Sequence, residues 1–264
     1  MAAPQKLGLV IPTLNEEQNL VPLLQRLHNV LYPLVTPYEI LIVDGGSTDR
    51  TLDFARDYAK GHAEIKVLSD PRRSGLAAAV VHGWQNTSAP FLGAMDADLQ
   101  HPPELVPALL SGVIQGADLV IASRYVNGKE IAGWSPLRRI ASRLGTRLTA
   151  PLLPPNLHLT DPLSGFFILR RSCIEGIPLQ VIGFKILLEI IVCANVSSAV
   201  EVPFEFGFRQ SGESKATLKV GLEYLRLLMS LRARKRMRHS SLTSADHVAI
   251  VPGVPGTRAR AAGP

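Results

Sequence analysis

The first half of the chain alternates short, unbroken apolar runs with segments that have helical periodicity. The apolar runs read LGLVIP, EILIVD, EIKVL, FLGAMD and DLVIAS. The helix-like segments lie between them, at residues 16–31, 49–60, 74–85 and 102–115. Strands that are apolar throughout belong to sheets covered on both faces, and helices between strands favour parallel connections. We therefore predict an α/β fold whose mainly parallel, Rossmann-like sheet carries helices on both faces.

The second half is less regular and supplies amphipathic helices. A basic amphipathic helix is predicted over residues 134–148, where arginine recurs at every fourth position and leucine and isoleucine line another face. Residues 183–194 predict a buried helix, and residues 217–238 predict a long helix that ends in RARKRMR. We expect the first and the last of these helices to face a membrane.

The net charge of +6 is confined to the C-terminal end. Residues 232–264 hold seven Lys and Arg against a single Asp, so residues 1–231 are neutral. A charge excess of this kind indicates a surface or membrane function before a nucleic-acid one. We predict no nucleic-acid partner, although a nucleic-acid binder that uses the tail remains an alternative. Its binding would be sensitive to salt and would be lost with residues 232–264.

Cysteine content and hydropathy indicate a reducing compartment. Cys173 and Cys193 lie among apolar neighbours and predict two reduced core thiols. The N-terminus lacks the apolar stretch of a signal peptide, and no transmembrane helix is evident. We therefore expect a cytoplasmic protein that is peripheral at the cytosolic face of a membrane.

Two aspartates follow the fourth apolar run, in AMDADLQHPPE. Asp96 and Asp98 have the i, i+2 spacing with which two carboxylates can meet one cation where a strand gives way to a loop. Mg²⁺ and Mn²⁺ prefer such hard oxygen ligands, completed by waters and substrate phosphates. The alternative is that the pair merely caps the helix that begins near Pro102.

The second apolar run ends in Asp44-Gly-Gly-Ser-Thr-Asp49. Asp44 can accept hydrogen bonds from a nucleobase or a ribose, and the glycines allow backbone to approach a ligand. Ser47 or Thr48 is predicted to cap the helix that begins near Asp49. Neither G-x-x-x-x-G-K-[ST] nor G-x-G-x-x-G occurs here, which argues against P-loop enzymes, kinases and standard dinucleotide enzymes.

A family resemblance rests on motifs that occur in order from residue 10 to residue 215. VIPTLNEEQNL, VDGGSTDRT, SGLAAAVVHG and AMDADLQHPPE resemble the inverting family 2 glycosyltransferases, which have the GT-A fold. SRYVNG, SPLRRIASRLGT, LTDPLSGFFILRR, GFKILLEI and FEFGFRQSGESK resemble the dolichyl-phosphate (polyprenyl-phosphate) mannosyltransferase group. The resemblance implies a GT-A domain over residues 1–231, with a nucleotide-sugar half at 1–124 and an acceptor half at 125–231. A basic tail, which we expect to be mobile, would follow at 232–264.

The resemblance also implies a set of site residues. The residues implied to surround a Mg²⁺ or Mn²⁺ cofactor are Asp96, Asp98 and Gln100. Those implied to bind the nucleotide sugar are Pro12, Thr13, Asn15, Glu16, Asp44, Asp49, Gly75, Asp96 and Ala97. Those implied to bind the acceptor phosphate are Arg124, Arg138, Ser142, Arg209 and Lys215. Asp98, Arg124 and Arg209 are implied to act in catalysis.

The acceptor chemistry agrees with an arginine set. A phosphate monoester has its second pKa near about 6, so it is already a nucleophile at neutral pH and needs no carboxylate base. It needs positioning and charge neutralisation, which arginine forks supply. Relatives that use hydroxyl acceptors often carry a Q-x-x-R-W box, which is absent here. Glu189 lies where a base might be sought, but we favour a structural or acceptor-side role in which Lys185 positions it.

The implied reaction is inverting transfer of a hexose to a polyprenyl (dolichyl-type) phosphate, with mannose from GDP-mannose as the favoured donor. The chain has GLAAA where the family often has GLGTA, which bears on donor preference. One alternative is the same fold with UDP-glucose or a UDP-aminosugar as donor to a bacterial polyprenyl phosphate. Another is a catalytically silent nucleotide-sugar-binding subunit. An accessory membrane subunit is a further partner that the sequence leaves open. His28, His62 and His82 lack metal-ligand spacing, and we expect no metal there.

Overall fold

The computed structural model describes residues 5–34, 36–70, 75–126, 136–180, 183–205 and 218–245. Within these ranges, side chains are described except at residues 136–141, 218–220 and 236–245. Three residues predicted to bind the acceptor phosphate are affected. Arg209 and Lys215 lie outside the described residues, and so does the side chain of Arg138.

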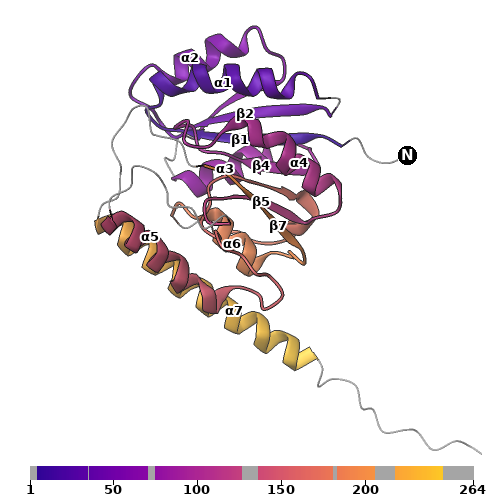
Figure 1. The fold of residues 1–264 in the computed structure, drawn as a ribbon, viewed down its shortest axis with the longest axis vertical. Helices are drawn as coiled ribbons and strands as arrows, with labels where there is room; N and C mark the ends of the chain where they lie inside the picture. Colours follow the sequence, from indigo (N-terminus) through magenta and orange to yellow (C-terminus); the bar gives the residue numbers. More distant parts are fainter. Residues whose placement is uncertain are drawn as a thin grey trace, which may run out of the picture.

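One seven-stranded sheet organises the described chain. Its strands are β1 (Leu7–Thr13), β2 (Tyr38–Asp44), β3 (Ile65–Ser69), β4 (Phe91–Ala94), β5 (Leu119–Ser123), β6 (Phe167–Arg170) and β7 (Ala199–Pro203). The strand order is β3-β2-β1-β4-β6-β5-β7 (Figure 1). β6 is antiparallel to both of its neighbours, and every other pairing is parallel. The predicted mainly parallel sheet is confirmed.

Helices cover both faces of the sheet, as predicted. The α-helices are α1 (Glu17–Leu31), α2 (Thr51–Ala59), α3 (Leu76–Gln85), α4 (Val106–Ile114), α5 (Pro136–Thr149), α6 (Ile186–Cys193) and α7 (Leu218–Ala245). The short 3-10 turns are η1 (Pro103–Leu105), η2 (Ala150–Leu152) and η3 (Arg171–Cys173). α1, α2 and α4 pack on one face, and α3 and α6 pack on the other. The helices of the first half begin and end within a few residues of their predicted bounds.

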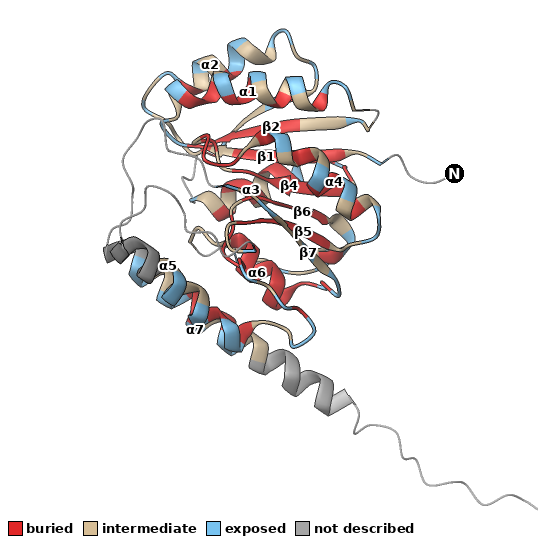
Figure 2. Ribbon diagram, viewed as in Figure 1, coloured by how far each residue is buried: buried red, intermediate tan, exposed pale blue. Residues whose placement is uncertain are grey.

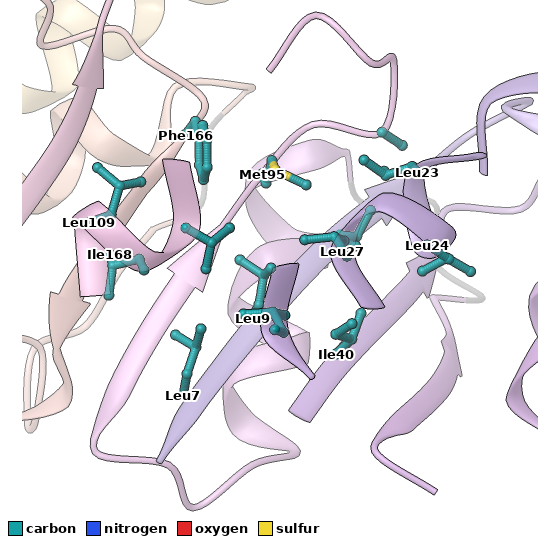
Figure 3. Close-up of a cluster of buried hydrophobic side chains, with 14 of the residues drawn as sticks. Leu7, Leu9, Leu23, Leu24, Leu27, Ile40, Met95, Leu109, Phe166 and Ile168 are labelled. Carbon is teal, nitrogen blue, oxygen red and sulfur yellow. The ribbon is translucent and has the colours of Figure 1, made fainter. Parts of the chain in front are cut away.

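The alternation of side chains along β1 explains the two layers. Leu7, Leu9 and Ile11 point into the cluster under α1 and α4, whereas Val10 points into the cluster under α3. Figure 3 shows the first of these clusters, in which leucines of β1 meet those of α1. On the other face α3 lies so close that a Cβ at Gly83 would come within 2.5 Å of Val10 Cγ2. Only glycine permits this approach of helix to strand.

The sequence patterns do not reveal β6 and β7. β6 has only four residues, and it follows a loop rather than a helix. Its position between β4 and β5 depends on pairing with strands that are distant in the sequence. Such pairings leave no periodic signal in so short a segment.

A third layer lies outside α6 and consists of α5 and α7 (Figure 1). Leu188 and Val192 of α6 pack against Leu227, Leu228 and Leu231 of α7. Tyr224 of α7 donates a hydrogen bond to the carbonyl of Gly145 on α5, at 2.7 Å. α7 continues through the predicted boundary at residue 231, so the division between domain and tail remains a prediction. Within the described residues, no helix is long and apolar enough to span a membrane.

A buried ion pair joins α6 to α7. Glu189 is almost fully buried, and its Oε1 accepts hydrogen bonds from Arg234 Nη1 and from the backbone N–H of Gln180, both at 2.5 Å. Arg234 also donates to the carbonyl of Pro178. Lys185 does not position Glu189, because its Nζ donates to the carbonyl of Leu163 instead. The geometry supports the structural interpretation of Glu189 and corrects the expected partner.

We expect Arg234→Ala to destabilise the fold strongly. Removal of one partner of a buried pair leaves the other charge uncompensated, and the loss in unfolding free energy should be about 3 kcal/mol. Urea denaturation measures this loss. Arg232→Ala, at an exposed position of the same helix, is the matched control and should change stability by less than about 0.5 kcal/mol. Equal effects of the two substitutions would show that the pair does not anchor α7.

Candidate active site

Two loops at the carboxyl ends of β1 and β2 are joined by reciprocal hydrogen bonds. The backbone N–H of Asn15 donates to Ser47 Oγ at 2.9 Å, and Asn15 Oδ1 accepts from the N–H of Thr48 at 2.8 Å. Asn15 has a φ of 57°, a left-handed conformation that asparagine tolerates better than most residues. The conformation of each loop therefore depends on the other, and together they form one rigid rim of the sheet.

Asp44 stabilises this rim from inside. Its side chain is buried, Oδ2 accepts from the N–H groups of Gly46 and Ser47, and Oδ1 accepts from Ser47 Oγ at 2.5 Å. Thr13 Oγ1 lies 3.4 Å from Oδ1 as well. Gly46 has a φ of 87°, which requires glycine in this turn. The contacts of Asp44 account for loop shape, and its predicted role at a nucleobase or ribose remains a prediction.

The Asp49 carboxylate accepts hydrogen bonds from backbone N–H groups at the N-termini of two helices. Its Oδ1 accepts from the N–H of Thr51 at 3.0 Å, at the start of α2, and its Oδ2 accepts from the N–H of Glu17 at 3.3 Å, at the start of α1. The prediction that Ser47 or Thr48 caps α2 is wrong, because Asp49 supplies the side-chain oxygen. Its predicted contact with the nucleotide has no support in this geometry. Glu16, by contrast, accepts from Asn19 at 2.7 Å and stays half-buried beside the rim.

The candidate cation ligands follow β4. Asp96 is about a third exposed, at 33% of its side chain, and Asp98 Oδ1 accepts from the N–H of Gln100 at 3.1 Å. Leu99 lies between Asp98 and Gln100, and its side chain is buried. Its backbone φ is 60°, which is a rare conformation for a leucine. The turn that contains Asp98 and Gln100 thus has a backbone conformation that leucine disfavours, and such conformations are common at functional sites.

The alternative role of the aspartate pair as a helix cap is not supported. The residue at the N-cap position of η1 is Pro102, and no side-chain hydrogen bond caps this turn. The Asp96 carboxylate packs against Gly165, where a Cβ would lie only 2.5 Å from Asp96 Oδ2. A glycine in this position leaves the carboxylate room to reach outward. The donor set of two carboxylates and an amide suits Mg²⁺ or Mn²⁺, which take oxygen ligands.

Arg124, at the end of β5, is fixed by a bidentate ion pair. Its Nε and Nη2 donate to Asp161 Oδ2 and Oδ1, both at 2.7 Å, and its backbone N–H donates to Asp161 Oδ2 at 3.1 Å. Asp161 is fully buried. Burial alone would lower the pKa of the Arg124 guanidinium, but the pair with Asp161 raises it above its ordinary value, and Asp96 adds to this effect. A permanently charged arginine therefore stands beside the carboxylate of Asp96.

Glu201 of β7 holds Asp161 in turn. Its carboxylate accepts from the backbone N–H of Asp161 at 2.8 Å and from the N–H and hydroxyl of Thr160, each at 2.9 Å. Thr160 Oγ1 also lies 2.9 Å from Ser123 Oγ. These contacts fix the loop before β6 to β5 and β7, so the geometry of the arginine fork is set by the sheet.

Lys185 and His101 complete the charged cluster. Burial lowers the pKa of Lys185 to about 8, with a further contribution from Arg124 that Asp96 and Asp161 oppose. Burial likewise lowers the pKa of His101 to about 4, against the opposing effect of Asp98. His101 Nδ1 lies 3.7 Å from Asp96 Oδ2. The site thus gathers acidic and basic side chains that influence one another electrostatically.

Tyr125 connects Arg124 to the outer helix layer. The Arg124 guanidinium lies 5.4 Å from the centroid of the Tyr125 ring, and the Tyr125 hydroxyl lies 2.7 Å from Ser142 Oγ on α5. Two predicted acceptor residues, Arg124 and Ser142, are therefore bridged by one side chain.

Gly75, with a φ of 88°, begins α3 close to Gly183, which precedes α6.

The structure brings together part of the predicted set and adds residues to it. Asp96, Asp98, Gln100 and Arg124 converge at the carboxyl edge of the sheet, and Pro12, Thr13 and Ala97 lie in the adjoining strand ends and turn. Residues that sequence reasoning did not assign to the site are Tyr125, Asp161, Gly165 and Lys185. Each of them lies within one of the sequence motifs on which the family resemblance rests. Membership of these motifs could therefore have indicated that they belong to the site.

Comparisons with known proteins identify the family of the chain. The family model described as "Glycosyl transferase family 2" matches residues 9–177. The chain is 42% identical over 226 residues to a protein of Pyrococcus furiosus named dolichol-phosphate mannosyltransferase, covering 86% of this chain and 63% of that relative. It is 34% identical over 220 residues to a polyprenol monophosphomannose synthase of Mycolicibacterium smegmatis, covering 80% of this chain and 81% of the relative.

A solved structure shows the same fold at low identity. Glucosyl-3-phosphoglycerate synthase from Mycobacterium tuberculosis, in complex with Mn²⁺, uridine-diphosphate-glucose and glycerol 3-phosphate, superposes with a TM-score of 0.63. The two chains share 19% identity, and the match covers 88% of this chain and 80% of that one.

The sheet and the family match define a glycosyltransferase domain of the GT-A type. The chain belongs to glycosyl transferase family 2, and its named relatives in that family include dolichol-phosphate mannosyltransferases. The predicted family is confirmed. The chain spans 63% of the length of the Pyrococcus relative.

We expect Gly165→Ala to weaken cation binding with little loss of stability. The added Cβ would displace the Asp96 carboxylate, and the backbone at Gly165 needs no positive φ. The affinity for Mn²⁺, measured by titration calorimetry in the presence of a nucleoside diphosphate, should fall by a factor of about ten or more, which corresponds to about 1.4 kcal/mol. Gly61→Ala, where a Cβ would meet nothing within 4 Å, is the matched control. Unchanged affinity in Gly165→Ala would remove Asp96 from the set of ligands.

Proposed function

We propose that the chain catalyses inverting transfer of mannose from GDP-mannose to a dolichyl or other polyprenyl phosphate, giving a lipid-linked β-mannosyl phosphate. The names of its relatives support mannosyl transfer to a lipid phosphate. GDP-mannose as donor follows from the family resemblance. The same fold with UDP-glucose or a UDP-aminosugar is the second candidate, since the solved structure with uridine-diphosphate-glucose shares this fold.

One observation carries the proposal. The Asp96 carboxylate contributes to the raised pKa of the Arg124 guanidinium, and Asp161 holds Arg124 in a buried two-pronged ion pair. Asp98 follows Asp96 in the same turn after β4. Cation-binding carboxylates can take a nucleoside diphosphate, and a fixed arginine can take a second phosphate. A reaction between a sugar diphosphate and a phosphate nucleophile needs both groups side by side. The arrangement therefore suits transfer to a phosphate better than transfer to a neutral hydroxyl.

We propose that Asp96, Asp98 and Gln100 hold Mg²⁺ or Mn²⁺. The fit rests on the partly exposed Asp96 carboxylate, on the space that Gly165 leaves for it and on the hard oxygen donors of the set. When bound, the cation supplies charge stabilisation to the departing diphosphate. Arg124 orients the incoming phosphate, and the rim formed by Asn15, Asp44 and their partners positions the nucleotide.

No carboxylate base is required at the acceptor side. The acceptor phosphate is already anionic, so a direct displacement at the anomeric carbon forms the new C–O bond as the bond to the diphosphate breaks, with inversion. Glu189, the candidate base, is tied to Arg234 and to the N–H of Gln180. Asp161 is likewise held by Arg124. Ser142, and also Arg138, Arg209 and Lys215, complete the proposed acceptor set.

We propose that the outer helices rest on the cytosolic face of a membrane. Both α5 and α7 carry exposed residues (Figure 2), and large apolar side chains are among them. They are Leu144 and Leu148 on α5, and Leu222, Leu225 and Met229 on α7. Exposed basic side chains, including Arg143, Arg147 and Arg226, accompany them. Apolar side chains that enter the interface and cations that attract anionic lipids are the two elements of peripheral binding. Ser142 would then receive the lipid phosphate at the membrane surface.

The division of the chain stays within this proposal. The first half, residues 1–124, would bind the nucleotide sugar, residues 125–231 would bind the acceptor, and residues 232–264 would form a basic extension. An accessory membrane subunit remains compatible with the exposed outer layer.

A donor panel tests the reaction. Purified protein is given a short polyprenyl phosphate and GDP-mannose, UDP-glucose or a UDP-aminosugar, with Mg²⁺ or Mn²⁺ present and then chelated, and lipid-linked product is measured. We expect product from GDP-mannose only, and loss of product on chelation. Turnover of UDP-glucose without turnover of GDP-mannose would support the second candidate, and no transfer from any donor would support the silent subunit.

In the same assay Asp98→Ala should reduce transfer by a factor of about a thousand or more, because a removed charge-stabilising group costs about 4 kcal/mol of the barrier. Circular dichroism should show an unchanged fold. Asp53→Ala, an exposed aspartate on α2, is the matched control and should keep full activity. Retained activity in Asp98→Ala would refute the cation assignment.

Vesicle co-sedimentation tests the membrane face. Each Lys or Arg near an anionic surface contributes about 1 kcal/mol, so the double substitution Arg143→Gln and Arg147→Gln should weaken partition by about 2 kcal/mol, roughly 30-fold. The triple substitution of Leu222, Leu225 and Met229 by Gln should weaken binding to neutral vesicles as well. Val200→Gln, an exposed apolar residue on β7, is the control. Equal partition of all variants would place the membrane contact elsewhere.

A further inference from the structure

Two histidines and a glutamate converge at the edge of the sheet opposite to the candidate active site. His28 lies in the last turn of α1, and His62 and Glu64 lie in the connection from α2 to β3. One ligand atom from each side chain lies within 4.8 Å of the other two. Glu64 directly precedes β3, whereas the candidate cation ligands follow β4, and the two strands run parallel in one sheet. The two clusters are therefore at opposite ends of the strands.

We propose that His28, His62 and Glu64 form a second metal site, which takes Zn²⁺ or a similar borderline divalent cation and fastens α1 to the α2–β3 connection. This site is separate from the oxygen-rich site of Asp96 and Asp98, and it does not depend on the proposed transferase activity.

The distances match the geometry of a tetrahedral zinc site. Glu64 Oε1 lies 3.2 Å from His62 Nδ1 and 3.6 Å from His28 Nδ1. With metal–ligand bonds of about 2.0 Å, neighbouring ligand atoms of a tetrahedron are about 3.3 Å apart. The observed separations lie on either side of this value. The fourth position is left for water, because all three side chains are partly exposed, at 32%, 25% and 26%.

A nitrogen atom in the cluster is buried and has no hydrogen-bond partner among the described residues. His28 Nδ1 is inaccessible to solvent and makes no hydrogen bond there. Its 3.6 Å separation from Glu64 Oε1 is too long for one. A buried polar atom without a partner is uncommon in proteins and calls for an explanation such as an ion. A cation bound between the three side chains would satisfy it.

The surroundings hold the ligands in place. The Tyr58 ring stacks on His62 at 4.4 Å, and the Tyr32 ring lies 5.2 Å from His28. The backbone is also fixed, since the N–H of Ile65 donates to the carbonyl of His62 at 3.0 Å and the N–H of Ile40 donates to the carbonyl of Glu64 at 2.9 Å. Ligands whose orientation is set before binding favour metal affinity.

The type of ligand separates this site from the first. Imidazole nitrogen suits Zn²⁺ and its neighbours in the transition series, whereas carboxylate and carbonyl oxygens suit Mg²⁺ and Mn²⁺. Glu64 adds a carboxylate oxygen, which zinc sites also accept. Sequence spacing does not reveal the cluster, because separate elements supply its members.

Cobalt substitution tests the site on the full chain. Protein freed of metal with a chelator is titrated with Co²⁺, whose visible bands are intense in a tetrahedral site and weak in an octahedral oxygen site. We expect intense bands that saturate at one equivalent and that Zn²⁺ removes. They should be lost in His28→Gln, His62→Gln and Glu64→Gln. They should persist in His82→Gln, a partly buried histidine on α3, and in Asp98→Ala.

Thermal unfolding supplies a second readout. Zn²⁺ should raise the Tm of the unsubstituted chain and of His82→Gln, and should leave that of the three ligand variants unchanged. In the presence of chelator the ligand variants should unfold near the same Tm as the original chain, which would show that they fold. If a histidine variant does not fold, the comparison of Glu64→Gln with the original chain tests the site. Absence of intense bands in the unsubstituted chain, or bands that follow Asp98→Ala rather than the histidine variants, would overturn the proposal. Failure of the donor panel would leave this result unaffected, since neither readout involves transfer.

Discussion

The antiparallel insertion of β6 is the constraint on which the candidate site depends. β4 and β5 both end at the carboxyl edge of the sheet, and β6 runs the other way between them. The loop that precedes β6 must therefore lie at that same edge. Phe167, at the start of β6, pairs with Ala94 near the end of β4 and with Ile121 of β5. This register places Gly165 against Asp96 and Asp161 against Arg124.

The same insertion explains how a buried charge pair can be tolerated. Asp161 is removed from water, and an isolated carboxylate there would be strongly unfavourable. Arg124 supplies two hydrogen bonds to the Asp161 carboxylate, and Glu201 accepts from the backbone N–H of the same residue. A buried ion pair of this kind adds little net stability. Its contribution is to orientation, because it fixes an arginine fork that a flexible surface loop would leave variable.

Local sequence was sufficient for the elements of the first half and for the residues at their ends. Asp44 and Asp96 could be placed because each follows an unbroken apolar run, and the ends of parallel strands share an edge. Asp161 could not be placed in this way, since its position depends on a four-residue strand whose partners are distant in sequence. The same reason hides the grouping of His28 with Glu64. The hydrogen bonds that Asp49 accepts at the starts of α1 and α2 were not predicted either, because they depend on two helices that the sheet brings together.

One turn of α6 connects the candidate site with the outer helices. Lys185 stands just before the helix and donates to the carbonyl of Leu163, in the loop that carries Asp161 and Gly165. Glu189, four residues on, lies one turn along the same face and binds Arg234 of α7. A helix of two turns whose eight residues are all buried has little freedom to bend or rotate. The position of α7 is thereby fixed relative to the loop before β6. In the proposed function, a lipid phosphate held where the outer layer meets the sheet would reach Arg124 in a geometry that the core sets, rather than one set by the mobility of surface side chains.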